Sequence, residues 1–377
     1  MKKSHIGLVV VGVLALILAG CTPAVSNGPN SDSSAAAGPS GACIPQVKAD
    51  VEAASEPSKL VAPTAGLDLA ALTGKNIWYI TNSQNQFSTE MSTGVKEAGA
   101  AAGVKITVFD GQNSTSKYSE GINQAIAQAA DGIVLMAIQP AVVKEDLAAA
   151  AAAGIKVLNT LNGDPDEAVP ASTFANLSAQ YTKDGELMGK WALLDSNCKA
   201  NILVVQSSPV HVWDLAAKGI TKAVTDLCPK DCKVKVLDID PANIATDTGR
   251  QLQTALQVDP DVNYVLPVWD SSMPYVAPAV AASGSKAKVL AHDGISDSLK
   301  LIASGKDQVG TVAMSPPGWI GWAAFDEVAR AIVGDKSPNY VIPTRLVTKS
   351  NVGDGGIADV SPNYRDYQSA FKEAWSK

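Results

Sequence analysis

Short apolar runs alternate with amphipathic segments along the chain from residue 75 onward. Residues 77–81 are apolar and are followed by a polar loop at 82–86. A segment with an apolar residue every three or four positions comes next, which predicts a helix. Gly103 ends this helix, and residues 104–109 form a second apolar run. This order predicts a βαβ unit with parallel strands and a right-handed crossover.

The same alternation continues through both halves of the chain. Further buried strands are predicted to begin near Gly132 and Lys156, and then at residues 202–206, 234–239, 263–268, 288–292 and 309–314. Helices are predicted at residues 46–54, 116–130, 140–154, 296–304 and 318–333, with an amphipathic segment at the end of the chain. Spacings of about thirty residues fit one βα unit each. The pattern predicts two doubly wound α/β lobes with parallel sheets, at about 75–172 and 176–313.

Length and charge support two domains and exclude some partners. The chain has 377 residues, of which 46% are hydrophobic and 5% aromatic, so two ordinary cores can form. Its formal net charge is −7 and no basic run follows the N-terminus. An acidic chain of this kind is not expected to bind nucleic acid or an anionic membrane surface.

The N-terminus indicates export. Lys2 and Lys3 precede an apolar run at 6–18, which is too short to span a bilayer and is typical of a signal peptide. The run ends in Leu18-Ala19-Gly20-Cys21, which resembles a bacterial lipobox and implies cleavage before Cys21 with a lipid on its thiol. The alternative is a plain signal peptide with a chance cysteine. The Ser-, Ala-, Gly- and Pro-rich residues up to 42 predict a flexible tether.

Four cysteines remain in the mature domain, and their number is even: Cys43, Cys198, Cys228 and Cys232. In an oxidising compartment this predicts two disulfides, with three connectivities open. The alternative is a zinc site, but no histidine lies near the last two cysteines. The candidate histidines His211 and His292 are predicted to be structural residues rather than metal ligands, and we expect no cofactor.

Catalytic motifs are missing from the sequence. It has no G-x-x-x-x-G-K-[ST] phosphate loop, no G-x-G-x-x-G after a strand and no G-x-S-x-G elbow. We therefore predict that the protein is not an enzyme.

Several local runs resemble the sugar-binding proteins of bacterial ABC importers, of the ribose-binding type. They are GVKEAGAAAGVKITVFDGQN, INQAIAQAADGIVLMAIQP, AAAAAGIKVLNTL, DPDVNYVLPVWD and KVLAHDGISDSLKLIASG. The resemblance covers about residues 75–350 and lies in the order and spacing of the series. It implies the periplasmic binding protein type I fold, in which two lobes joined by a three-segment hinge close on a small ligand. Here the crossings would fall near residues 172–176, 314–317 and 342–344.

The resemblance divides the chain into six parts. These are a signal peptide (1–20), a tether (21–42), an N-terminal extension (43–74), an N-terminal lobe (75–174 plus 315–342), a C-terminal lobe (175–314 plus 343–352) and a tail across the hinge (353–377).

The family's ligand positions are kept in part. Asn85 and Phe87 match an Asn and an aromatic residue in the loop after the first strand, and Asp293 matches a ligand-binding Asp. At other positions this chain departs from the residues that are usual in the family. It has Leu161-Asn162 where Asp-Arg is usual, Asp214 where Arg is usual, Trp269 where Asn is usual, His292 where Phe is usual and Met314 where Gln is usual. Trp213, Asp270 and Trp319 complete the candidate site.

These departures bear on the ligand. Loss of both arginines removes fork-like donors, while Asp214 and Asp293 supply acceptors. Such a site favours a sugar or polyol, or an amine held by the carboxylates and by cation–π contact, and disfavours phosphates and carboxylates.

Each candidate also has a structural interpretation. Asp214 and Asp293 are placed to cap helices, and Asn85 to form a turn. Phe87 is placed to pack at the start of its helix, and the tryptophans are ordinary core aromatics on this interpretation.

The resemblance predicts a monomeric, lipid-anchored binding protein that passes its ligand to ABC permease subunits. A ligand sensor of the same fold is the alternative that the sequence leaves open.

Overall fold

The computed structural model describes residues 43–356, 361 and 366–377. The predicted signal peptide, the lipidation site Cys21 and the tether lie outside these residues, as do residues 357–360 and 362–365 of the predicted tail. No helix within the described residues is long and apolar enough to cross a membrane.

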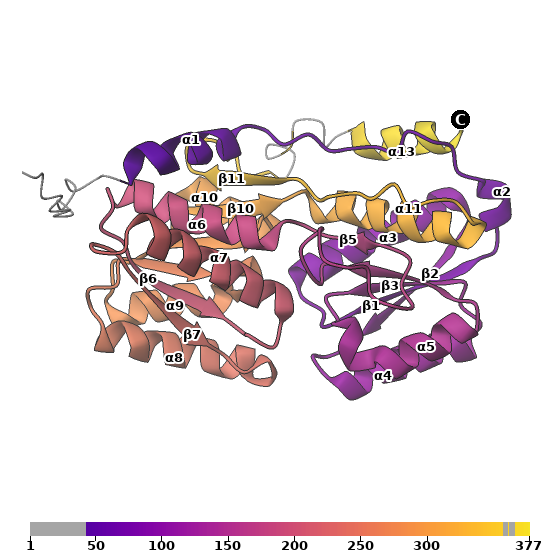
Figure 1. Cartoon of the computed structure of the whole chain (residues 1–377), viewed down its shortest axis with the longest axis horizontal. Helices are drawn as coiled ribbons and strands as arrows, with labels where there is room; N and C mark the ends of the chain where they lie inside the picture. The colour runs from indigo at the N-terminus through magenta and orange to yellow at the C-terminus, as the bar shows by residue number, and fades with distance from the viewer. Residues whose placement is uncertain (1–42, 357–360, 362–365) are drawn as a thin grey trace, which may run out of the picture. The chain divides into compact units, whose positions relative to one another are not determined.

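The first lobe is built on a parallel sheet in the order β2-β1-β3-β4-β5. Its strands, in chain order, are β1 (Asn76–Thr81), β2 (Lys105–Asp110), β3 (Gly132–Met136), β4 (Lys156–Thr160) and β5 (Asn176–Leu177). Figure 1 shows this sheet with helices on both of its faces.

Alternation along β1 separates two cores. Ile77 and Tyr79 pack with α3 (Gln86–Ala102) and α11 (Pro317–Val333). Trp78 and Ile80 face the opposite side, where α4 (Thr115–Ala127) and α5 (Lys144–Ala152) pack. Successive side chains of a strand point to opposite faces, so a strand between two helical layers is apolar throughout.

Glycine lets α3 and α11 pack closely. A Cβ atom on Gly94 would collide with the carbonyl oxygen of Gly318, and one on Gly321 would collide with that of Met91. The contact between these helices therefore requires glycine on each of them.

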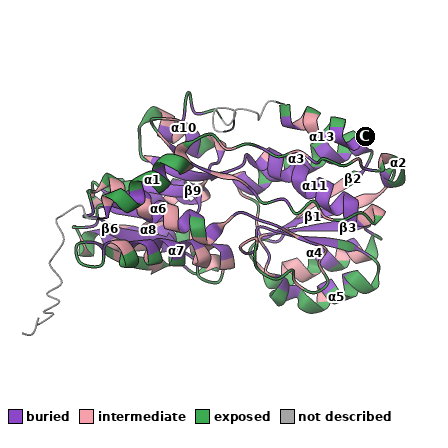
Figure 2. Ribbon diagram, turned by 45° about the horizontal axis from the view of Figure 1, so that its top comes forward, coloured by how far each residue is buried: buried purple, intermediate pink, exposed green. Residues whose placement is uncertain are grey.

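The second lobe has a sheet in the order β11-β10-β9-β8-β6-β7. Its strands are β6 (Asn201–Gln206), β7 (Lys233–Asp238), β8 (Tyr264–Pro267), β9 (Lys288–Asp293), β10 (Gly310–Met314) and β11 (Thr344–Thr348), the last antiparallel to β10. Its helices are α6 (Tyr181–Asp195), α7 (His211–Leu227), α8 (Ile244–Val258), α9 (Met273–Ser283) and α10 (Ser296–Ser304). Most strands of both sheets are buried, and the exposed positions lie on helices and loops (Figure 2) and on the edge strand β7. The predicted fold of two α/β lobes is confirmed.

Two predicted helices differ from those observed. The helix predicted at 116–130 ends at Ala127, because Ala129 turns the chain with a φ of +49°. The helix predicted from Pro140 starts with a 3₁₀ turn, Pro140–Val143, before α5 begins at Lys144.

The described chain passes between the two sheets after β5, after β10 and before β11. Because β5 pairs with β4, the first of these crossings follows Leu177, a few residues beyond the expected position. The crossings contact one another: Ser178 bridges Val341, and the Ser315 amide donates to the Pro343 carbonyl at 2.8 Å.

The N-terminal segment contacts both lobes. Helix α1 (Ile44–Ser55) packs in the core of the second lobe, next to the Cys43–Cys198 disulfide. Farther along, the carbonyls of Ala65 and Gly66 accept hydrogen bonds from Arg330 on α11, each at 2.9 Å. The segment then enters α2 (Leu69–Leu72), as Figure 1 shows.

The end of the chain packs on the first lobe. Helix α13 (Tyr367–Trp375) stacks Trp375 on Trp322 of α11, with ring centroids 5.3 Å apart. The Trp375 carbonyl accepts a hydrogen bond from the Leu67 amide at 3.2 Å. The N-terminal segment and the last helix therefore support each other on α11.

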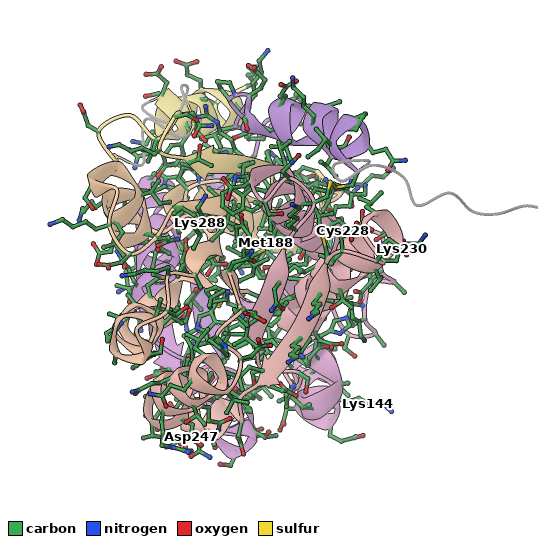
Figure 3. All side chains as sticks on the ribbon, turned by 90° about the vertical axis from the view of Figure 1, so that its left-hand side faces the viewer. Lys144, Met188, Cys228, Lys230, Asp247 and Lys288 are labelled. Atoms are coloured by element: carbon green, nitrogen blue, oxygen red, sulfur yellow. A yellow bond between two sulfur atoms is a disulfide. The ribbon has the colours of Figure 1, made fainter. Side chains whose placement is uncertain are left out.

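Two disulfides form in the described chain, Cys43–Cys198 and Cys228–Cys232. This pairing was one of the three that the sequence left open, and it leaves none of these sulfurs free for zinc. Figure 3 shows Cys228 near Lys230, in the turn that the Cys228–Cys232 disulfide closes.

Candidate functional site

A cavity of about 50 Å³ lies where the carboxyl ends of the two sheets face each other. Ligands bind at this edge in open parallel sheets. The residues that line it are Asn82, Asn85, Phe87, Met136, Ala137, Leu161, Tyr181, Val210, Val212, Trp213, Trp269, Ser271, Asp293 and Met314. Six of the fourteen end a strand or follow one directly: Asn82, Met136, Ala137, Leu161, Asp293 and Met314.

The structure brings together part of the predicted site. Six of the candidates line the cavity: Asn85, Phe87, Trp213, Trp269, Asp293 and Met314. The other five, Asn162, Asp214, Asp270, His292 and Trp319, do not line it. The ligand contacts themselves stay a prediction for all of these residues.

Asn85 shapes the entry to α3. Its side chain accepts a hydrogen bond from the Ser88 amide at 3.0 Å, and the Ser88 hydroxyl accepts one from the Asn85 amide at 2.9 Å. This capping box satisfies free amides of the first helical turn. Phe87 is 4% exposed and belongs to the core under α3, so both residues have a structural role while they line the cavity.

Two tryptophans form an apolar wall of the cavity. Trp213 on α7 and Trp269 after β8 stack nearly in parallel, with ring centroids 4.4 Å apart and an angle of 12° between planes. Trp213 packs against the cores of both lobes. Flat apolar rings of this kind suit the apolar face of a sugar or a cationic group.

Asp293 is held in an unusual backbone conformation. Its φ is +121°, a value that residues other than glycine rarely adopt. Its carboxylate accepts a hydrogen bond from the Asp270 amide at 3.3 Å and lies 3.0 Å from Nδ1 of His292. Strain of this sort persists where the surroundings determine it and is typical of functional sites.

His292 links Asp293 to a second carboxylate. Its Nε2 lies 3.2 Å from Asp184 of α6, and the ring is fully buried. Both ring nitrogens face carboxylates, so both donate only when the ring is protonated. Burial lowers the pKa of His292, but the hydrogen bonds with Asp184 and Asp293 outweigh this effect and raise it to about 10.

Asp270 supports the turn that follows β9. Its buried carboxylate accepts hydrogen bonds from the amides of Gly294 (2.6 Å) and Ile295 (3.3 Å), and from the side chains of Gln308 (2.8 Å) and Thr311 (3.1 Å). Burial and the charge of Asp293 raise the pKa of Asp270 to about 7. Asp270, rather than Asp293, therefore satisfies the amides before α10.

The remaining candidates have partners elsewhere. The Asn162 side chain donates a hydrogen bond from Nδ2 to Oδ1 of Asn159 at 2.7 Å, and Asp214 pairs with Lys218 one helical turn along α7. Trp319 is buried in the first-lobe core and donates to the Val61 carbonyl at 2.9 Å. The His211 ring lies 3.0 Å from the Glu167 carboxylate, a contact that joins the two lobes.

Some lining residues were missed from the sequence. Tyr181 begins α6, its ring lies 5.5 Å from that of His292, and its hydroxyl donates to the Met314 sulfur at 3.8 Å. Leu161, with a φ of +58°, lines the cavity in place of its neighbour Asn162. The signal that could have identified Tyr181 was its position in the first turn of the helix that follows a crossing between the lobes.

The electrostatics of the cavity are simple. Asp293 is the only charged side chain among its described lining residues, and neither Lys nor Arg is among them. The site offers a carboxylate, two asparagines and aromatic rings. It suits hydrogen-bond donors or a cation, and not anions.

Comparisons with known proteins agree with this geometry. Residues 78–336 match the family model described as a periplasmic binding protein domain. No curated protein matches the chain by sequence. The match to the family model shows that the chain belongs to the periplasmic binding protein family.

Solved structures of this fold are similar over most of the chain. A 5-methylthioribose transporter solute-binding protein from Thermotoga lettingae is 18% identical, with a TM-score of 0.69, over 79% of this chain and 98% of its own. A carbohydrate transporter from Acidothermus cellulolyticus in complex with myo-inositol is 19% identical, with a TM-score of 0.65, over 80% and 99%. A solute-binding protein from Mycobacterium smegmatis with bound glycerol is 24% identical, with a TM-score of 0.66, over 74% and 96%.

The family binds solutes and does not catalyse reactions, so the protein is not an enzyme. Membership of a periplasmic binding family also implies export.

Asp293→Ala is expected to weaken ligand binding at least tenfold, about 1.4 kcal/mol, because it removes the charged acceptor of the cavity. Isothermal titration calorimetry measures the affinity for the sugar or polyol found by screening. Asp214→Ala is the matched control, since that carboxylate pairs with Lys218 outside the cavity. Unchanged affinity in Asp293→Ala, or an equal loss in both variants, would remove Asp293 from the site.

The raised pKa of His292 predicts that the folded protein loses stability as the pH rises. Its folded-state pKa of about 10 exceeds the ordinary 6.5, so the folded protein holds this proton more tightly than the unfolded chain. This stabilisation is full below pH 6.5 and is lost as the pH rises to about 10.

We therefore expect the free energy of unfolding, measured in urea, to fall between pH 7 and 9.5. The slope should be smaller in His292→Gln and retained in the control His211→Gln. Equal slopes in the wild-type protein and His292→Gln would contradict the assignment.

Proposed function

We propose that the protein is the substrate-binding lipoprotein of an ABC importer, which captures a sugar or polyol between its lobes and delivers it to a permease. The observation that carries this proposal is the cavity between facing strand ends, which Asp293 and the stacked pair Trp213–Trp269 line together. Hydroxyl groups would donate to Asp293 and to Asn82 or Asn85, and an apolar ring face would lie against Trp213 or Trp269.

The ligand class follows from the charges. A cavity whose described lining residues include one carboxylate and no basic side chain disfavours phosphates and carboxylates. Hydroxyl-rich neutral molecules meet its requirements, and the structural neighbours named above have myo-inositol and glycerol bound.

Capture depends on the hinge. Both lobes line the cavity, so a ligand makes all its contacts only when they are closed. Ligand binding would therefore shift an equilibrium between open and closed forms towards the closed one. The crossings that contact each other at Ser178, Val341 and Ser315 would be the hinge.

The membrane anchor rests on the sequence alone. Cleavage before Cys21 and lipidation of its thiol would hold the monomeric protein at the outer face of the cell membrane through the tether. The permease would then receive the ligand at the same surface.

A ligand that carries an amine is the second candidate. It is favoured by Asp293 as the one charged lining residue described and by the stacked pair Trp213–Trp269. A cation would gain from the carboxylate and from the ring faces together.

A thermal-shift screen of the full chain against sugars, polyols, amino sugars and amines tests the proposal. A ligand at 100 times its Kd adds about 2.7 kcal/mol of stability, which gives a clear rise in Tm. We expect such a rise with a particular sugar or polyol. A rise with amines alone would favour the second candidate, and no rise with any compound would contradict both.

A further inference from the structure

A second hollow of about 410 Å³ adjoins the cavity, between α9 and α10 of the second lobe and the start of α3. We call it the α9–α10 groove. Its lining residues are Asn85, Gln86, Asp270, Ser271, Met273, Pro274, Ala277, Pro278, Ile295, Asp297, Ser298 and Leu301. Asn85 and Ser271 line both the groove and the cavity, so the two spaces meet at these side chains.

The walls of the groove are apolar and stiff. Apolar surface comes from Met273 and Ala277 of α9, from Leu301 of α10 and from Ile295, the residue before α10. Pro274 and Pro278 are four residues apart on one side of α9, and their fixed φ angles restrict this wall. A stiff apolar groove loses little conformational entropy when it is filled.

Two hydroxyl groups in the groove have no hydrogen-bond partner. The Oγ atoms of Ser271 and Ser298 are buried and unpaired, and Ser298 is only 1% exposed. Leaving a buried hydroxyl without a hydrogen bond is unfavourable, so such groups are rare in folded proteins. Both serines line the groove, and Ser271 stands at its junction with the cavity.

We infer that the α9–α10 groove binds an apolar substituent of the same ligand whose hydroxylated part occupies the cavity. The ligand would be an alkyl, aryl or thioether derivative of a sugar or polyol, with its linking oxygen or sulfur near Ser271. This inference rests on the proposed function and names the substrate class more closely.

Size and position favour the ligand as the occupant. The cavity measures about 50 Å³, while the groove beside it measures about 410 Å³. Both lobes line the groove, because Asn85 and Gln86 belong to the first. The groove is therefore completed by the same closure that completes the cavity.

Calorimetry with matched compounds tests the inference on the full chain. The probes are glycerol, myo-inositol, D-ribose and D-glucose, each as its methyl and its n-hexyl ether or glycoside. We expect the hexyl form of the bound member to bind at least tenfold tighter than the methyl form, since each buried methylene adds favourable transfer energy.

A pair of variants locates the effect on α9. Ala277→Glu places a charge in the groove and should remove the preference for the hexyl form. Ala282→Glu is the control, because Ala282 is exposed on the same helix and does not line the groove. This variant should keep the tenfold preference.

Other outcomes overturn the inference in distinguishable ways. Equal or weaker binding of hexyl forms, or a preference that survives Ala277→Glu, would overturn the groove assignment and leave the proposed function standing. A dimer in sedimentation that Ala277→Glu disrupts would assign the groove to a second copy of the chain. No binding by any compound of either series would overturn the proposed function and the inference together.

Discussion

The pairing of one buried histidine with two carboxylates is the interaction on which the site depends. His292 lies between Asp184 and Asp293, and Thr344 of β11 donates to the other oxygen of Asp184 at 2.8 Å. Asp184 is on the first helix after a crossing, and Thr344 is on the strand that follows the last one. A buried charge is tolerated only with such partners. The Asp293 carboxylate in the cavity is therefore positioned, through His292 and Asp184, by α6 and β11. Each of these elements follows a crossing between the lobes.

The N-terminal segment limits how the lobes move. One end is joined to the second lobe by the Cys43–Cys198 disulfide, and the other is held on the first lobe by Arg330. Between α1 and these contacts, residues 56–63 form neither helix nor strand. Any opening of the lobes would have to be absorbed by this stretch and by the crossings.

The sequence predicted most of the fold because buried parallel strands and amphipathic helices have distinct periods. It also identified Asn85, Phe87 and Asp293 as candidates near the ends of strands, where the cavity lies. The sequence could not show which of two adjacent residues lines the cavity. Trp213 lines the cavity, while Asp214, one position on in the same helix, pairs with Lys218; Leu161 replaces Asn162 because of a backbone turn. Besides its neighbour Asp293, His292 contacts Asp184 and Tyr181 of a distant segment, and no local pattern marks these two residues.

The central claim is that Asp293 anchors a hydroxyl-rich ligand between the lobes. A crystal structure of the protein with the tightest-binding sugar or polyol tests it most directly. The account predicts a ligand hydroxyl within hydrogen-bond distance of the Asp293 carboxylate and an apolar face of the ligand against Trp213 or Trp269. A ligand bound outside this cavity, or one that leaves Asp293 in contact with His292 and Asp270 alone, would contradict it.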